Sequence, residues 1–181
     1  NQQASNLAKQ GYMGAYPSSL GQEACQVAAA LALEPADWLF PTYRDSVAVM
    51  SRGIDLAEVL SPFHGSSHCG YAPTKTHTAP EATPLATHTA HAVGLAMAAK
   101  FAGDSTVALA MCGDGSTSEG DFHEALNLAA VFEAPVVFLV QNNGYAISTP
   151  VSRQMRAASI AAKGEGYGMP AYRVDGNDFE Q

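Results

Sequence analysis

The sequence predicts an α/β protein, a three-layer fold in which a parallel sheet has helices on both faces. Two short apolar runs, residues 106–112 and 135–140, have no polar face, as expected of strands buried in a parallel sheet. Between them, apolar residues recur at helical spacing over 122–132. A strand, a helix and a second strand form a right-handed parallel crossover, so both strands should end at the same edge of the sheet.

The helix between the two strands is expected to begin near Ser118. Residues 116–119 fit a capping box, in which a hydroxyl and a carboxylate satisfy the free backbone N–H groups of the first turn. Pro135 follows Ala134 and ends the helix, because proline cannot continue it.

Further helices are predicted on both sides of this unit. Their expected ranges are 1–10, 22–33 with a cap at Ser18 or Ser19, 46–52, 89–103 and 159–164. Residues 172–178 are expected to form a third parallel strand and the loop at its carboxyl end. Residues 61–87, rich in Pro, Thr and His, form the longest irregular stretch and are expected to line or cover a site.

Polar residues follow both predicted strands at the edge where the strands end. Asp114 offers a carboxylate, Asn143 a side-chain carbonyl, and the irregular backbone through Tyr145 a main-chain carbonyl. Oxygen donors of this kind suit Mg²⁺, which takes its remaining ligands from phosphate and water. The helix expected after Gly115 would point free N–H groups and the positive end of its dipole at the same place. The residues therefore predict a site for a magnesium ion and a diphosphate.

Other interpretations of these motifs fit less well. Asp-Gly and Asn-Gly pairs are common turn formers, but here they end two adjacent buried strands. A dinucleotide-binding loop would need a third glycine where Ser118 stands, and an acid at the end of the second strand where the sequence has amides. Glu119 occupies the position of the glycine in an EF-hand, and the Gly-Lys-Ser/Thr of a P-loop is missing.

Composition limits the classes of function. The chain has 181 residues, of which 47% are hydrophobic and only 14% charged, so part of its surface is expected to meet a partner protein. A net charge of −8 and nine unclustered Lys and Arg residues argue against nucleic acid or a membrane as partner. Three cysteines without paired spacing suggest reduced thiols, in a bacterial cytoplasm or a mitochondrial matrix.

The spacing of the two polar motifs resembles that of a known family. The Gly-Asp-Gly of 113–115, the 26 residues 116–141 and the following Asn-Asn resemble the thiamine-diphosphate fingerprint. Residues 118–127 and 141–148 narrow the match. The chain looks like the α subunit of the decarboxylating component of a 2-oxo acid dehydrogenase complex, of branched-chain or pyruvate type.

This resemblance covers about residues 21–178 and implies a thiamine-diphosphate-binding fold. We expect one thiamine-diphosphate-binding domain over residues 1–181, lacking part of the N-terminal and C-terminal regions of the family subunit. Similar α subunits continue past this region, with a mobile loop whose histidine contacts the diphosphate.

The resemblance also implies roles for residues of this sequence. The cofactor would be bound by Tyr43, Arg44, Thr83, Leu85, Asp114, Gly115, Ser116 and Asn143, and the magnesium ion by Asp114, Asn143 and Tyr145. Pro84, Thr87 and His88 lie in the segment that holds a potassium ion in branched-chain members. His88 replaces a glutamine there, and an imidazole is a poor potassium ligand.

Several polar residues have a second interpretation. Arg44 suits a phosphate, but it could instead form a surface ion pair with Asp45. Zinc binding would involve His64, His68 and Cys69, whose spacing matches no usual zinc pattern.

Two further residues complete these expectations. His123 is expected to be packed or hydrogen-bonded in the interior. Gln141 stands where branched-chain members have a basic residue, so phosphate binding would depend more on Mg²⁺ and Arg44.

The activity implied by the resemblance is oxidative decarboxylation of 3-methyl-2-oxobutanoate or a related branched-chain 2-oxo acid, with acyl transfer to a lipoyl group. The implied partners are a β subunit in an α2β2 heterotetramer, which supplies the catalytic glutamate, and the lipoyl domain of the acyltransferase component. No catalytic residue is assigned to this chain. The alternatives are a pyruvate dehydrogenase α subunit, a cofactor-binding or assembly module without turnover, and a nicotinamide-binding domain.

Overall fold

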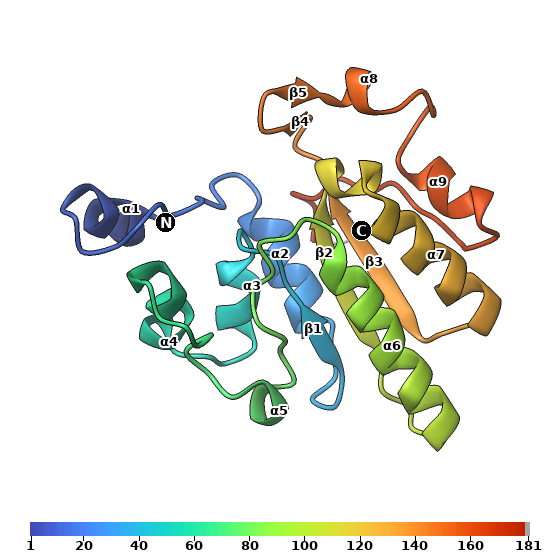
Figure 1. Ribbon diagram of the computed structural model, residues 1–181, viewed down its shortest axis with the longest axis horizontal. Helices are drawn as coiled ribbons and strands as arrows, with labels where there is room; N and C mark the ends of the chain where they lie inside the picture. Colours follow the sequence, from blue (N-terminus) through green and yellow to red (C-terminus); the bar gives the residue numbers. More distant parts are fainter. Residues whose placement is uncertain (180–181) are drawn as a thin grey trace.

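The computed structural model describes residues 1–179 and has a parallel three-stranded sheet at its centre (Figure 1). The strands are β1 (Trp38–Phe40), β2 (Ala108–Gly113) and β3 (Val136–Gln141), in the order β1-β2-β3. The register pairs Gly113 with Gln141, so β2 and β3 end together. The α/β class and the predicted parallel pairing of the two apolar runs are confirmed.

Helices pack on both faces of this sheet. On one face, Leu109 and Met111 of β2 pack with residues of α2 (Glu23–Leu31) and α3 (Ser46–Ser51). On the other, Ala108 and Ala110 pack with α6 (Thr87–Ala102). Because successive side chains of a strand point to opposite faces, the uninterrupted apolar run of β2 fills two separate cores.

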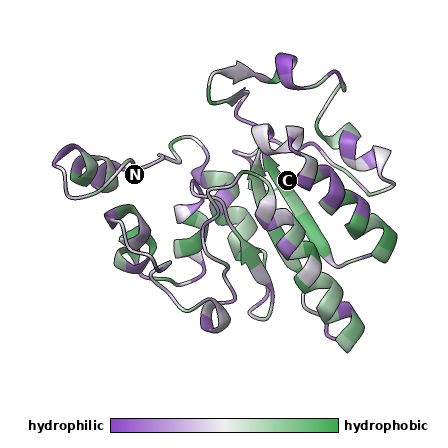
Figure 2. Cartoon of the chain, in the orientation of Figure 1, coloured by the Kyte–Doolittle hydropathy of each residue, from purple (hydrophilic) through white to green (hydrophobic). Residues whose placement is uncertain are grey.

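The helix α7 (Gly120–Phe132) connects β2 to β3 and packs beside α6 (Figure 1). Its Phe122 and Leu126 form a third core with Cys112 at the end of β2. Apolar colour is concentrated on β3 and on the sides of α6 and α7 (Figure 2).

The remaining elements are short and lie around this unit. They are α1 (Gln2–Lys9), α4 (Leu56–Leu60), η1 (Ser61–His64), α5 (Pro73–Thr76), η2 (Asp114–Ser118), β4 (Tyr145–Ala146), β5 (Thr149–Pro150), α8 (Val151–Gln154) and α9 (Ala161–Gly166). The antiparallel β4–β5 hairpin stands above the carboxyl end of the sheet (Figure 1). No helix within residues 1–179 has the length and apolar character needed to cross a membrane.

Most predicted helices are present with shifted ends. The helix predicted at 89–103 begins two residues earlier and ends at Gly103, whose φ of +71° is the left-handed conformation that glycine adopts readily. The predicted cap of α2 is wrong, because Gln22 precedes the helix without a side-chain cap. The hydroxyls of Ser18 and Ser19 instead donate to the side-chain oxygen of Asn1.

The predicted capping box at residues 116–119 is also wrong. Residues 114–118 form the 3-10 helix η2, and α7 begins only at Gly120, without a side-chain cap from Glu119. The Ser116 hydroxyl donates to the carbonyl oxygen of Leu85 at 2.5 Å. A contact with a distant segment has therefore replaced the local cap, and the N-terminus of α7 does not follow Gly115 directly as expected.

The third strand is not where the sequence predicted it. Residues 171–175 have no regular secondary structure, and the side chain of Tyr172 is 84% exposed. The third strand is β1, which pairs in parallel with β2. With three residues, β1 is too short to show the alternation that identifies a strand in a sequence.

Candidate functional site

A cavity of about 140 Å³ lies at the carboxyl ends of β2 and β3. It brings together most of the residues predicted to bind the cofactor and metal: Tyr43, Arg44, Leu85, Asp114, Gly115, Ser116, Asn143 and Tyr145. Thr83, Pro84, Thr87 and His88 are not among its lining residues. Residues far apart in the sequence therefore meet at the edge where open α/β sheets bind ligands.

Asp114 is the buried acid of this cavity. It follows β2 directly and is only 2% exposed. Its Oδ2 accepts a hydrogen bond of 3.0 Å from the side-chain amide of Gln154 on α8. Within residues 1–179, Asp114 forms no ion pair, so its charge is met by a neutral donor.

Asn143 lies across the cavity in a turn that its own side chain stabilises. Its Oδ1 accepts from the backbone N–H of Tyr145 at 3.1 Å, and the Oδ1 of Asn142 accepts from Gly144 in the same way. Asx turns of this kind explain why two asparagines follow β3. They point the backbone of residues 143–145 back toward η2.

Gly115 permits the chain after β3 to approach η2 closely. A Cβ atom at Gly115 would lie 2.8 Å from the Cβ of Ala146, closer than real side chains approach. The β4–β5 hairpin therefore packs directly on the backbone of η2, and a glycine is required for steric reasons.

Tyr43 and Arg44 also line the cavity. The guanidinium carbon of Arg44 lies 5.5 Å from the centroid of the Tyr43 ring, and Nη1 donates to the carbonyl oxygen of Ser18 at 2.7 Å. The backbone N–H of Tyr43 donates to Ala82 at 3.0 Å, which ties this segment to the irregular stretch 61–87. The alternative surface ion pair between Arg44 and Asp45 is not formed, because the Asp45 carboxylate is turned into the interior.

Sequence reasoning missed part of the lining: Gln22, Thr42, Ala146 and Ile147. Ile147 is 99% exposed and has a φ of +56°, a conformation that a β-branched residue rarely adopts. A backbone outlier is not visible in a sequence. From the sequence, Gln141 is only a departure from a family pattern, yet in the structure it also lines the cavity.

The side chains expected to hold potassium are engaged elsewhere. The hydroxyl of Thr87 donates to Asp121 at 3.1 Å. His88 is 4% exposed, and its Nε2 lies 2.6 Å from the carbonyl oxygen of Met111. Burial lowers the pKa of His88 and favours the neutral ring, whose N–H then belongs on Nε2. These side chains do not fit a potassium site.

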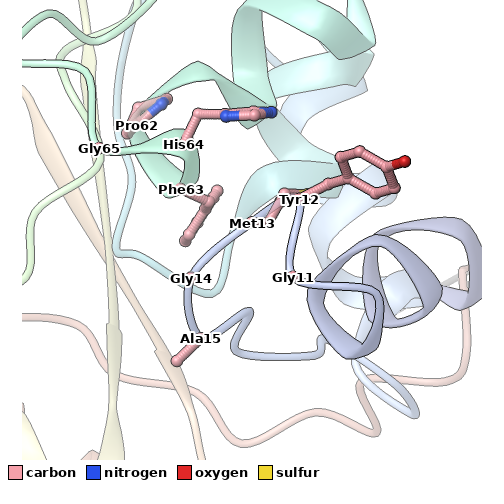
Figure 3. Close-up of a pocket in the computed structure, with 9 residues that line it drawn as sticks. All are labelled: Gly11, Tyr12, Met13, Gly14, Ala15, Pro62, Phe63, His64 and Gly65. Atoms are coloured by element: carbon pink, nitrogen blue, oxygen red, sulfur yellow. The ribbon is translucent and has the colours of Figure 1, made fainter.

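Neither His123 nor His64 lies in the cavity. His123 contacts the hydroxyl of Tyr167 through Nδ1 at 2.9 Å and the carbonyl oxygen of Thr117 through Nε2 at 3.1 Å, so it is hydrogen-bonded as expected, although it is half-buried and not fully interior. His64 lines a separate hollow with Phe63 and Tyr12 (Figure 3), which shares no lining residue with the cavity. The part of the chain that the structure describes has no group of three His, Cys, Asp or Glu side chains arranged for a metal.

The donor set of the cavity fits a magnesium ion. Asp114 has a carboxylate, Asn143 an amide oxygen and Tyr145 a main-chain carbonyl, and all three residues line the cavity. These donors are all oxygen atoms, as Mg²⁺ prefers, and they leave coordination positions for a phosphate and water.

Comparison with known proteins shows close relatives. The chain is 53% identical over 173 residues to a 3-methyl-2-oxobutanoate dehydrogenase subunit alpha from Mycobacterium tuberculosis, covering 96% of this chain and 47% of that protein. It is 42% identical to a mitochondrial 2-oxoisovalerate dehydrogenase subunit alpha 2 from Arabidopsis thaliana, covering 94% of this chain and 38% of the relative. It is 40% identical to a pyruvate dehydrogenase E1 component subunit alpha from Acholeplasma laidlawii, with shares of 94% and 50%.

The fold also matches a solved structure. A transketolase from Campylobacter jejuni superposes with a TM-score of 0.76 at 24% identity, over 98% of this chain and 32% of that enzyme. This likeness concerns the fold alone. The chain spans about half the length of the curated relatives it matches or less. The family model described as Dehydrogenase E1 component matches residues 1–181, and the chain therefore belongs to that family.

Proposed function

We propose that this chain is the cofactor-binding part of the α subunit of a thiamine-diphosphate-dependent 2-oxo acid dehydrogenase. The observation that carries the proposal is the meeting of Asp114, Asn143 and Arg44 around one cavity at the carboxyl edge of a parallel sheet. Family membership and the thiamine-diphosphate fingerprint support the identity of the ligand. They also support assigning the fold to the thiamine-diphosphate-binding class, as one domain.

The residues of the cavity divide into two groups by chemistry. Asp114, Asn143 and the carbonyl of Tyr145 would hold Mg²⁺. Arg44, fixed by Ser18 and stacked near Tyr43, would bind the diphosphate, since its planar donors match phosphate oxygens. Both groups act on the same charged end of the cofactor.

The size of the cavity indicates which part of the cofactor it takes. Pockets for drug-sized ligands enclose roughly 300–1,000 Å³, and this cavity has about 140 Å³. It suits the diphosphate and its metal. The rings would extend past the exposed side chains of Leu85, Tyr145 and Ile147, to be enclosed by a β subunit in an α2β2 assembly.

This placement separates the proposed role of the cofactor from that of the residues of this chain. Bound thiamine diphosphate supplies the carbanion and the electron sink that decarboxylation of a 2-oxo acid requires. The residues of this chain hold the charged end in place and orient the rest toward the partner. We assign the catalytic glutamate to the β subunit, and the acceptor of the acyl group to a lipoyl domain.

The proposed substrate is 3-methyl-2-oxobutanoate or a related branched-chain 2-oxo acid. The name of the Mycobacterium tuberculosis relative, at 53% identity, supports this choice. Pyruvate is the second candidate, because a relative at 40% identity is named as a pyruvate dehydrogenase subunit. Carbon dioxide release from each acid by the complete protein with its β subunit would decide between them.

The decisive experiment measures binding of thiamine diphosphate with MgCl₂ to the complete protein by calorimetry. We expect Asp114→Asn to weaken binding by at least about tenfold, or about 1.4 kcal/mol, because a neutral amide is a poorer magnesium ligand. Glu124→Gln is the matched control, since Glu124 is an exposed acid of α7 outside the cavity. Its affinity should equal that of the wild type.

Three outcomes would contradict parts of the proposal. Equal affinity of Asp114→Asn and the wild type would remove the assigned metal site. Stabilisation by NAD, and none by thiamine diphosphate with Mg²⁺, would favour a nicotinamide-binding domain. Cofactor binding without carbon dioxide release in the presence of the β subunit would indicate a binding or assembly module.

A further inference from the structure

A buried carboxylate lies behind the cavity. Asp45 has no exposed surface, and its Oδ2 accepts two hydrogen bonds of 2.7 Å from the backbone N–H and the hydroxyl of Thr42. Its Oδ1 accepts from the side-chain amides of Gln141 at 2.6 Å and Gln26 at 3.1 Å. Four donors therefore converge on one side chain.

This carboxylate joins two walls of the cavity. Thr42 directly precedes Tyr43 and Arg44, while Gln141 directly precedes the Asn142–Asn143 turn. The bond between Asp45 and Gln141 spans 96 positions of sequence. The hydrogen bond between Asp45 and Gln141 therefore links the Tyr43–Arg44 segment to the Asn142–Asn143 turn on the other side of the cavity.

Both ends of the Gln141 side-chain amide are hydrogen-bonded. Gln141 donates through Nε2 to Asp45, and its Oε1 accepts from the Nε2 of Gln26 at 3.0 Å. The Nε2 of Gln26 also lies 3.2 Å from the carbonyl oxygen of Arg44, so its two hydrogens are shared among three acceptors. Rotating the Gln141 amide would place its NH₂ against that of Gln26 and its oxygen against the carboxylate, so the orientation is fixed.

We infer that Asp45 and Gln141 form a positioning pair, whose buried hydrogen bond holds the Tyr43–Arg44 segment and the Asn142–Asn143 turn at the separation needed to contact one ligand together. The identity of that ligand, a magnesium-bound diphosphate, rests on the proposed function. Neither residue is assigned a chemical step. The pair acts through Arg44 and Asn143.

The geometry makes the pair testable by exchanging its two functional groups. Asp45→Asn brings a donor against the Gln141 amide, or, if the new amide rotates, against the backbone N–H of Thr42. A buried donor without an acceptor is strongly unfavourable. In the double variant Asp45→Asn/Gln141→Glu, the new amide can donate to the new carboxylate, which also accepts from Gln26.

The experiment measures thiamine diphosphate and Mg²⁺ affinity of the complete protein with its β subunit, at a temperature where each variant is folded. We expect Asp45→Asn to bind at least about tenfold more weakly than the wild type. The double variant is compared by amide exchange without ligand, because Gln141 lines the cavity and a carboxylate there would itself repel the diphosphate. Ser46→Ala is the control, because it removes a neighbouring part-buried hydrogen bond, to Glu81, that does not reach Gln141. It should lower the melting temperature and leave the affinity unchanged.

A second measurement needs no ligand. Amide hydrogen exchange in Asp45→Asn should rise in both residues 42–45 and residues 141–145, and in the second range Ser46→Ala should match the wild type. Unchanged affinity and exchange in Asp45→Asn, or a double variant whose amides exchange as fast as those of the single variant, would overturn the inference. Failure of the wild type to bind thiamine diphosphate would instead overturn the proposed function, and exchange would still test the pair.

Discussion

The side-chain amide of Gln154 donates a hydrogen bond of 3.0 Å to the carboxylate of Asp114. The same nitrogen lies 3.0 Å from the carbonyl oxygen of Thr149, so one side chain ties the β4–β5 hairpin and α8 to the acid at the end of β2. A metal ion bound to the Asp114 carboxylate would compete directly with this hydrogen bond from Gln154.

Gln154→Glu should make the protein dependent on Mg²⁺ for stability. Without a metal, the new carboxylate would face Asp114 at hydrogen-bonding distance, and like charges destabilise each other. We expect a lower melting temperature in EDTA and a larger increase on adding MgCl₂ than in the wild type. Gln154→Ala removes the contact without adding charge. Equal magnesium responses in both variants would contradict the prediction.

Gly115→Ala should destabilise the protein by about 1–3 kcal/mol, the usual cost of overpacking. The new methyl would collide with Ala146, so the hairpin would have to move. The double variant Gly115→Ala/Ala146→Gly should recover most of this free energy of unfolding in urea. Gly113→Ala is the control, because a Cβ there meets nothing within 4 Å. A loss in the control as large as that in Gly115→Ala would point to backbone effects instead.

Glu81 should make stability fall as the pH rises. Burial raises the pKa of its carboxyl to about 8, and its Oε2 is buried without a hydrogen-bond partner. Since the folded state holds a proton that the unfolded state releases above its ordinary pKa, stability falls between about pH 4.5 and 8, by up to about 1.4 kcal/mol per unit.

Glu81→Gln removes that proton release. Its free energy of unfolding should be less dependent on pH across this range. The stability of the variant relative to the wild type should therefore increase from pH 5 to pH 8. Urea unfolding at several pH values measures the difference. Parallel pH profiles for the two proteins would show that Glu81 keeps an ordinary pKa.

Potassium should have no specific effect on this protein. Thr87 and His88 are committed to Asp121 and Met111, and a neutral imidazole offers no oxygen ligand. Melting temperatures in KCl and NaCl at equal ionic strength should agree. His88→Ala should cost about 1–3 kcal/mol in both salts, because the buried Met111 carbonyl loses its partner. A potassium-dependent increase in the wild type would contradict this prediction.

The parts of the fold that the sequence predicted share one property, a pattern repeated over many residues. β2, β3 and α6 are long enough for composition and periodicity to identify them, and their polar ends placed Asp114 and Asn143 at one edge. The resemblance to a family added Tyr43 and Arg44, which no spacing rule would have placed in the same cavity.

The parts that it missed depend on contacts between distant segments. Ser116 bonds to Leu85 instead of capping a helix, and the bond between Gln141 and Asp45 leaves no local signature. Residues 172–178 have the composition of a strand, but a strand also needs a partner, and in the structure they pair with neither edge strand of the sheet, β1 or β3. Local sequence patterns therefore predicted where the site lies. The contacts that fix the relative positions of its residues come from distant segments and could not be predicted in this way.

The position of β3 at the margin of the sheet has a practical consequence. Among residues 1–179 it pairs with β2 alone, and Val137 is 53% exposed on a strand that carries no charged side chain. Natural proteins guard such margins with lysine, proline or a bulge, because an unguarded strand recruits the strands of other molecules. Among the described residues, this margin of β3 is therefore the place where a strand from another segment or another molecule can add to the sheet.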